Sequence, residues 1–181
     1  MATTKLMTAE DLFEMGSDSH VELIRGELVE MSPAGHESSS IALRLAIRVG
    51  AYIESNNLGS ISGADGGYII ARDPDIMVAP DFAFVRAERM PEREKRRQYL
   101  ELSPDFVVEV VSPSDRFTDL NDKVMLYLIA GVRLVWVVDP GRQTVTVYTP
   151  EHSPVFMSTA DTVDCGDVIP GFSLPVAEIF G

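Results

Sequence analysis

A short apolar stretch that contains one acidic residue places the strongest constraint on the fold. Residues 106–111 read Phe-Val-Val-Glu-Val-Val, and β-branched and aromatic residues of this kind favour a β-strand. Pro104 and Pro113 bound the stretch. Its only charged residue is Glu109, and burying a carboxylate costs several kcal/mol unless a partner compensates. We therefore expect a central strand in which Glu109 is paired with a basic side chain, a set of hydrogen-bond donors or a metal ion.

The helix predicted after this strand offers one such partner. Residues 118–131 have the apolar periodicity of a helix, which we expect to begin near residue 118 or 119. Residues four apart lie on the same side of a helix. The polar residues with this spacing are Asp119, Lys123 and Tyr127. If their stripe leans over the end of the strand, Lys123 reaches the face of Glu109.

Length and composition indicate one globular domain. The chain has 181 residues, of which 45% are hydrophobic and 24% charged, as in soluble globular proteins. No apolar run has the length of a membrane span, and the N-terminus lacks a secretory signal pattern. The single cysteine, Cys165, excludes an internal disulfide and favours a cytoplasmic location. We expect one domain over residues 1–181, divided into a helix and hairpin (1–31), a core (36–139) and C-terminal strands with a tail (140–181).

The charge distribution contains one argument against nucleic-acid binding and one segment that is compatible with it. The formal net charge of −13 argues against non-specific adhesion to nucleic acid. One local segment, residues 86–97, nevertheless carries six basic residues against three acidic ones. It is either a solvated loop or a phosphate-contacting surface. The candidate phosphate contacts in it are Arg93, Lys95, Arg96 and Arg97.

The remaining patterns predict an α+β or α/β fold with a mixed sheet. A capping box at residues 8–11 opens a short helix that runs to residue 15. Residues 20–31 form two alternating strands hinged at Arg25-Gly26, and residues 36–56 have the longest helical pattern. Further strands are expected at residues 59–72 (two, around a Gly-rich turn), 81–86, 133–139 and 144–148, with a tail at 169–180 that covers the core.

Asp81 is the natural second carboxylate beside Glu109. Three Pro-Asp pairs are present, ending at Asp75, Asp81 and Asp105. Asp105 lies on the strand of Glu109 but about 13 Å away, too far to share one metal ion. Asp75 lies in a turn-like stretch and is expected to be a solvated turn residue. Asp81 opens the preceding strand, so strand pairing would set it beside Glu109. Two converging carboxylates repel unless a divalent cation neutralises them, and oxygen ligands suit Mg²⁺ or Mn²⁺.

Several segments, taken in order along the chain, carry a family resemblance. They are residues 21–31, Pro80-Asp81, residues 104–114, the stripe Asp119–Lys123–Tyr127, and residues 131–140. Together they resemble the "Uma-two" family of restriction endonucleases, within the PD-(D/E)xK nuclease superfamily. The resemblance implies a restriction-endonuclease-like core, in which a mixed four-stranded sheet is flanked by helices and extended by extra strands. It also implies Mg²⁺-dependent cleavage of DNA, with Asp81 and Glu109 as metal ligands, and a homodimer.

The chain departs from the superfamily pattern at one position. Two residues after Glu109 the pattern has a lysine, whereas this chain has Val111. The backbone carbonyl of Val111 would then complete the metal shell. We hypothesise that Lys123 supplies the missing ammonium group from the following helix.

Four further residues match accessory positions or stand near the expected site. Glu22 matches the acidic position of the family in the first hairpin and is a candidate accessory ligand. Alternatively, Glu22 pairs with Arg25 or Arg133. His36 either contacts a phosphate or caps its helix. Asp119 and Tyr127 are accessory candidates on the stripe of Lys123.

Three functions therefore remain open. The first is a DNA nuclease that uses Asp81, Glu109 and Lys123. The second is a catalytically inactive relative that serves as a binding or dimerisation module, which Val111 and the acidic net charge favour. The third is a hydrolase in which Glu109 and another carboxylate act as an acid/base pair without a metal. Metal binding separates the first from the other two.

Overall fold

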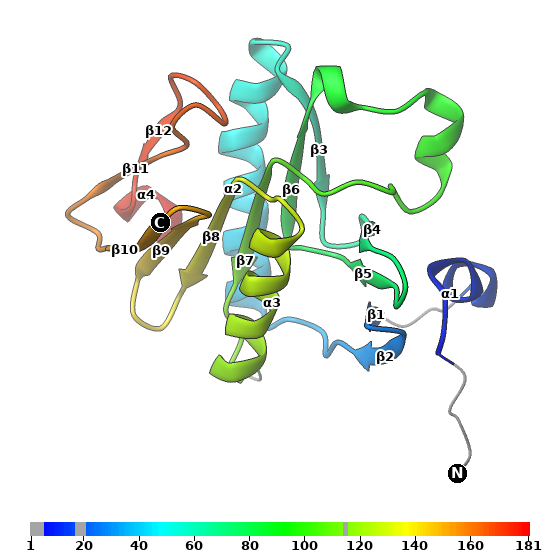
Figure 1. Cartoon of the computed structure of the whole chain (residues 1–181). Helices are drawn as coiled ribbons and strands as arrows, with labels where there is room; N and C mark the ends of the chain where they lie inside the picture. The colour runs from blue at the N-terminus through cyan, green and yellow to red at the C-terminus, as the bar shows by residue number, and fades with distance from the viewer. Residues whose placement is uncertain (1–5, 17–20, 114–115) are drawn as a thin grey trace.

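A six-stranded mixed β-sheet runs through the middle of the molecule (Figure 1). The computed structural model describes residues 6–16, 21–113 and 116–181; His20 and Ser114, which belong to the predicted hairpin and to one matched segment, lie outside these ranges. In spatial order the strands are β10 (His152–Met157), β9 (Thr144–Thr149), β8 (Leu134–Asp139), β7 (Phe106–Val110), β6 (Phe82–Arg86) and β3 (Gly59–Gly63). Only β7 and β8 are parallel to each other; the other neighbours are antiparallel. The predicted α+β class with a mixed sheet is confirmed.

Two long helices cover opposite faces of this sheet (Figure 1). The helix α3 (Phe117–Ile129) makes the crossover that a parallel strand pair requires, here between β7 and β8. It packs with Val107 in one apolar cluster, whereas α2 (His36–Ser55) packs with Phe106 and Val108 in another. The alternation predicted for β7 is thus present. The face of β7 that carries Glu109 looks toward α3.

A second, four-stranded sheet lies beside the first. Its order is β2 (Glu27–Glu30), β1 (Val21–Ile24), β5 (Ile76–Val78) and β4 (Tyr68–Ala71). The two strands expected within residues 59–72 both exist, but β3 pairs with β6 in the large sheet and β4 pairs with β5 in the small one. The sequence patterns did not indicate β5. The chain passes from β5 to β6 through residues 79–81, which places Asp81 between the two sheets and just before β6.

The N-terminal helix is anchored by an acidic residue that the sequence assigned to solvent. The helix α1 (Ala9–Met15) has the predicted capping box, in which Thr8 is the N-cap. The backbone N–H of Ala9 donates to the carboxylate of Asp75 at 2.9 Å, and Arg72 forms an ion pair with the same oxygen at 2.7 Å. Asp75 is only 7% exposed, so its prediction as a solvated turn residue is wrong. An N–H at the start of a helix lacks a partner within the helix, and Asp75 supplies it.

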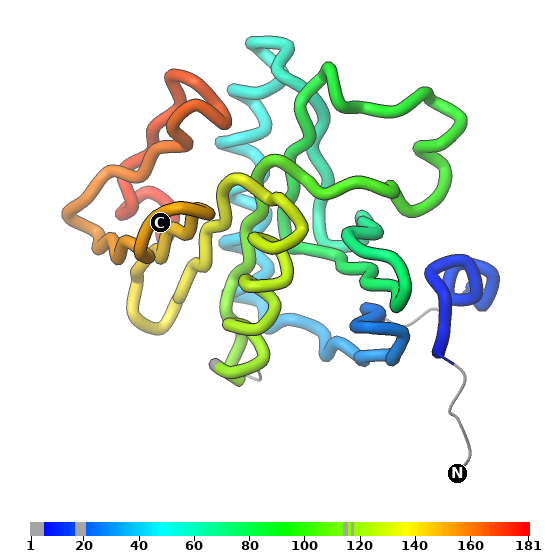
Figure 2. The backbone as a smooth tube through the Cα atoms, viewed as in Figure 1, coloured from blue at the N-terminus to red at the C-terminus, as the bar shows by residue number. Residues whose placement is uncertain are grey.

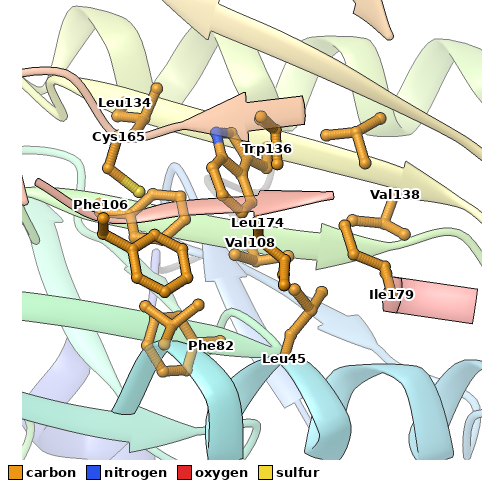
Figure 3. Packing of buried hydrophobic residues seen from close by; sticks show 14 of the residues in the cluster. Leu45, Phe82, Phe106, Val108, Leu134, Trp136, Val138, Cys165, Leu174 and Ile179 are labelled. Carbon is orange, nitrogen blue, oxygen red and sulfur yellow. The ribbon is translucent and has the colours of Figure 1, made fainter. Parts of the chain in front are cut away.

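The C-terminal tail closes the main core, as predicted. It contains β11 (Thr162–Asp164), β12 (Ser173–Pro175) and α4 (Ala177–Phe180). Leu174 and Ile179 of this tail pack with the buried rings of β6, β7 and β8 (Figure 3). Among those rings, Phe106 meets Trp136 edge-on at 4.8 Å between centroids. Fully burying a large apolar side chain contributes about 1.5–3 kcal/mol.

The remaining segments lie around the sheets. The C-terminal tail and α1 lie on opposite sides of the molecule (Figure 2). Two short 3-10 helices, η1 (Ala87–Arg89) and η2 (Arg93–Arg97), interrupt the long connection from β6 to β7. Among the helices of the described residues, none combines the length and apolarity needed to cross a bilayer.

Candidate active site

Glu109 of β7 is buried and paired, as its position in an apolar strand requires. Its residue exposure is 7%. Its Oε1 accepts a hydrogen bond from the Tyr127 hydroxyl at 2.6 Å. The same oxygen forms an ion pair with Lys123 Nζ at 2.9 Å. Lys123 and Tyr127 lie one turn apart on α3, so the crossover helix brings both donors over the end of β7. The predicted contact between Lys123 and the face of Glu109 is confirmed.

Glu22 brings a second carboxylate to the same ammonium group. Lys123 Nζ lies 2.8 Å from Oε1 of Glu22, and the same oxygen accepts the backbone N–H of Ala79 at 2.8 Å. Glu22 is 3% exposed. The alternative partner Arg133 pairs instead with Asp167. Lys123 therefore joins a carboxylate of the small sheet to a carboxylate of the large sheet.

Asp81 reaches this cluster from the connection between the sheets. Phe82 lies opposite Val108 in the antiparallel register of β6 and β7, which sets Asp81 beside the end of β7. Asp81 Oδ2 accepts the backbone N–H of Val110 at 2.7 Å. The sequence placed Asp81 as the first residue of the strand, whereas β6 begins one residue later. Its predicted convergence with Glu109 is nonetheless present.

These residues share one pocket of about 460 Å³. The charged groups of the predicted site that line it are Glu22, Asp81, Glu109 and Lys123. They come from four separate segments of the chain. Three carboxylates of the predicted site therefore lie around one ammonium group, at the end of β7 and between the two sheets, and Asp65 adds a fourth carboxylate to the pocket lining.

Burial and repulsion set the protonation of this cluster. Burial raises the pKa of Glu109 to about 7; Lys123 and Tyr127 oppose this rise, and the charges of Asp81 and Glu22 reinforce it. Burial by itself lowers the pKa of Lys123, but the carboxylates of Glu109 and Glu22 outweigh it and hold that pKa above its ordinary value. Burial, followed by the charge of Glu109, raises the pKa of Tyr127 well above its ordinary value. At neutral pH the ammonium is charged, the phenol is a donor, and Glu109 is poised between its two forms.

The donor atoms fit a hard divalent cation that binds together with its substrate. Within the described residues no three His, Cys, Asp or Glu side chains are arranged as a complete metal cage. Mg²⁺ in phosphate-processing sites needs only one or two carboxylates, with waters and substrate oxygens completing its shell. Asp81 and Glu109 face one pocket and repel each other, as two ligands of such an ion would. The carbonyl of Val111, the third predicted ligand atom, already accepts the Ser38 hydroxyl at 3.0 Å.

Other predicted residues lie outside this pocket. His36 is the first residue of α2 and exposed, and because Gly35 is the N-cap, His36 does not cap the helix. Asp119 is exposed and accepts the Thr118 hydroxyl at 3.1 Å. The four basic candidates of η2 are also exposed, and Arg96 donates to a backbone carbonyl. None of these side chains lines the pocket.

The structure also shows residues in the pocket, and one residue beside it, that sequence reasoning missed. Ser38 is buried to 3% exposure and fixes the carbonyl of Val111. Tyr99, Met31 and Met77 form apolar walls. A buried serine in the first turn of a helix is only a weak indication of a site residue. Tyr99, Met31 and Met77 come from separate connections and strands. No spacing in the sequence relates them to Glu109.

Comparisons with known proteins identify the family and the fold. The family model described as "Uma2: Putative restriction endonuclease" matches residues 9–177. Among solved structures, a crystal structure described as a "putative nuclease belonging to DUF820" from Anabaena variabilis superposes with a TM-score of 0.84. Its sequence is 18% identical, and the match covers 96% of this chain and 97% of that chain. At this identity the likeness shows a shared fold. A search of curated proteins found no match.

Proposed function

Because the chain belongs to the Uma2 family of "putative restriction endonucleases", we propose that it hydrolyses phosphodiester bonds of DNA in this pocket with a divalent metal ion. The observation that carries the proposal is the position of Lys123. Its ammonium lies 2.9 Å from Glu109 and within the pocket that Asp81 also lines. A carboxylate pair with an adjacent fixed cation is an arrangement suited to phosphoryl chemistry.

Asp81 and Glu109 are the proposed ligands of Mg²⁺ or Mn²⁺. When bound, such an ion supplies polarisation of a phosphoryl oxygen and activation of an attacking water. Tyr127 donates to Oε1 of Glu109 and so restrains the rotation of that carboxylate. The backbone N–H of Val110 holds Asp81 in the same way. Both carboxylates are therefore oriented before a substrate arrives, which lowers the cost of organising the site.

Lys123 supplies the ammonium group that Val111 cannot. Because its pKa is held above the ordinary value by two carboxylates, it stays charged throughout the neutral range. We assign to it the neutralisation of charge that develops on the phosphoryl group, or the orientation of the attacking water. Glu22 positions Lys123 and is the proposed accessory ligand. The roles of His36 and Asp119, of the Val111 carbonyl, and of the basic residues of η2 stay predictions.

Calorimetry of Mg²⁺ and Mn²⁺ binding tests the proposal, followed by DNA cleavage assays. We expect wild type to bind and Glu109→Gln to lose both binding and cleavage. Asp105→Asn is the matched control, since Asp105 is a buried carboxylate that precedes the same strand and pairs with Arg89 outside the pocket. This control should retain binding. Absence of metal binding in wild type would contradict the proposed function.

Two alternatives each have an observation in their favour. The ammonium of Lys123 is already paired with Glu22 and Glu109, which suits an inactive structural module. This alternative predicts no metal binding and a gain in stability on Glu109→Gln. The pKa of about 7 at Glu109 suits metal-free acid/base hydrolysis with Asp81 as the second carboxylate. That alternative predicts cleavage that persists in EDTA.

The homodimer implied by the family resemblance is a further part of the proposal. A homodimer would supply two copies of the pocket. Sedimentation equilibrium over a range of protein concentrations measures it directly. A mass near 19.9 kDa at every concentration would show a monomer instead.

A further inference from the structure

We infer that the pocket accepts an unpaired strand, so that the substrate is single-stranded DNA and not an intact duplex. The inference rests on the proposed function, because it names the substrate class of the same site. Three features of the pocket carry it: the recessed position of the reactive groups, the walls around them, and the sparse positive charge.

Three of the four reactive groups lie below the protein surface, and the fourth, Asp81, is partly exposed. Glu22 is 3% exposed, Glu109 is 7% exposed, and the side chain of Lys123 is 12% exposed. A phosphate that reacts here must approach groups that the protein almost covers. The phosphates of a duplex are fixed on the outside of a stiff, wide cylinder, whereas a single strand is narrow and flexible enough to bring one phosphate into a recessed pocket.

The walls of the pocket come from three segments of the chain. They are formed by the β2–α2 connection, the β3–β4 turn and Tyr99, and they enclose about 460 Å³. This volume lies in the range of small-ligand pockets. The β2–α2 connection contributes Met31, Pro33 and Ala34. Because the walls come from both sheets, the width of the pocket is set by the fold itself.

Tyr99 provides an aromatic surface that is fixed in place. Its ring packs edge-on against Phe13, with 5.2 Å between centroids and 86° between planes. On another side it lies so close to Gly67 that a Cβ there would be 2.3 Å from Cδ1 of Tyr99. A restrained aromatic ring is the surface on which unpaired bases stack, largely independently of sequence. Met31 and Met77 add adaptable apolar contacts beside it.

The charge of the pocket is unlike that of a duplex-binding surface. Lys123 is the only lysine or arginine that lines it among the described residues, alongside four carboxylates. Duplex binders contact many phosphates through lysine and arginine, and single-strand binders also line their grooves with positive charge, so contacts to phosphates are few here for either substrate. We therefore expect recognition here to depend on stacking, with a shallow dependence of affinity on salt concentration.

Fluorescence anisotropy with Ca²⁺ in place of Mg²⁺ tests the inference without cleavage. The probes are a labelled single-stranded oligonucleotide and the duplex of the same sequence, followed by cleavage of both in Mg²⁺. We expect the single strand to bind and be cleaved at least tenfold better. Tyr99→Ala should weaken its binding roughly tenfold, while Tyr99→Phe, which keeps the ring, should bind like wild type. Tyr148→Ala is the control, because Tyr148 is a partly buried tyrosine outside the pocket.

The outcomes separate this inference from the proposed function. Equal or better binding and cleavage of the duplex would overturn the strand preference and leave the nuclease function standing. Single-strand binding that depends on Tyr99, without any Mg²⁺ binding or cleavage, would support the strand preference and overturn the nuclease function. Loss of binding in Tyr148→Ala equal to that in Tyr99→Ala would show a general loss of structure and overturn the role of Tyr99.

Discussion

Lys123 and Glu109 form an ion pair with 2.9 Å between Nζ and Oε1, although one residue belongs to α3 and the other to β7. Directly after β7 the chain has Val111 where the superfamily pattern has lysine. The crossover between β7 and β8 returns α3 across the face of β7, so a helix residue can present its ammonium near the same carboxylate. A cation beside Glu109 is therefore compatible with a valine at the strand position.

Lys123→Met should destabilise the protein strongly. It removes the shared partner of Glu22 and Glu109 and leaves two buried carboxylates facing each other, a change that costs about 3–5 kcal/mol. The cost should be smaller at pH 6 than at pH 8, because Glu109 can take up a proton. Urea unfolding measures the change. Arg133→Met is the control, since its exposed pair with Asp167 contributes about 0–1 kcal/mol; equal losses in the two variants would contradict the buried bridge.

Stability should fall as pH rises from about 4.5 to about 7. The ordinary pKa of Glu109 is 4.5 and its folded pKa is about 7, so the folded state binds more protons than the unfolded state between these values. Glu109→Gln has no group at residue 109 that titrates in this pH range. Its free energy of unfolding should therefore lack this decrease with pH. Urea unfolding at several pH values compares the two proteins, with the exposed Glu178→Gln as control. If the free energies of unfolding of wild type and Glu109→Gln change with pH in the same way, the raised pKa of Glu109 is refuted.

Tyr127→Phe should change the titration of Glu109 while preserving the fold. The variant removes a hydroxyl that donates to the charged form of Glu109 at 2.6 Å, so the pKa of Glu109 should rise further. The loss of this buried hydrogen bond should cost about 1–3 kcal/mol. Carbon NMR of labelled glutamate follows the titration. Tyr52→Phe, which removes a hydrogen bond to the carbonyl of Pro170, should leave the titration of Glu109 unchanged.

The parts of the site that the sequence predicted are those that depend on local patterns. Strand alternation and helical spacing are enough to bring Lys123 and Tyr127 to Glu109, because α3 follows β7 directly in the chain. The position of Asp81 beside Glu109 was predicted from one further assumption, that β6 pairs with β7. Glu22 was predicted from its match to the acidic position of the family in the first hairpin.

The unpredicted parts depend on contacts between distant segments. The burial of Asp75 requires the first N–H of α1, which is distant in the chain, in addition to the nearby Arg72. The pocket walls arise where two sheets meet, and β5, one strand of that junction, has only three residues. Tyr99 lies in an irregular connection whose path is set by its contacts with Gly67 and Phe13. The positions of these residues depend on packing between segments that are distant in the chain, and no single segment predicts them.

Metal binding should release protons at neutral pH if Glu109 is a ligand. A carboxylate must be deprotonated to bind Mg²⁺, and Glu109 with a pKa of about 7 is close to half protonated at pH 7. Binding at pH 7 should therefore release about 0.5 proton, and binding at pH 9 almost none. Calorimetry in two buffers with different ionisation enthalpies measures the number directly. Binding that releases no proton at pH 7 would contradict the combination of a raised pKa at Glu109 and its role as a ligand.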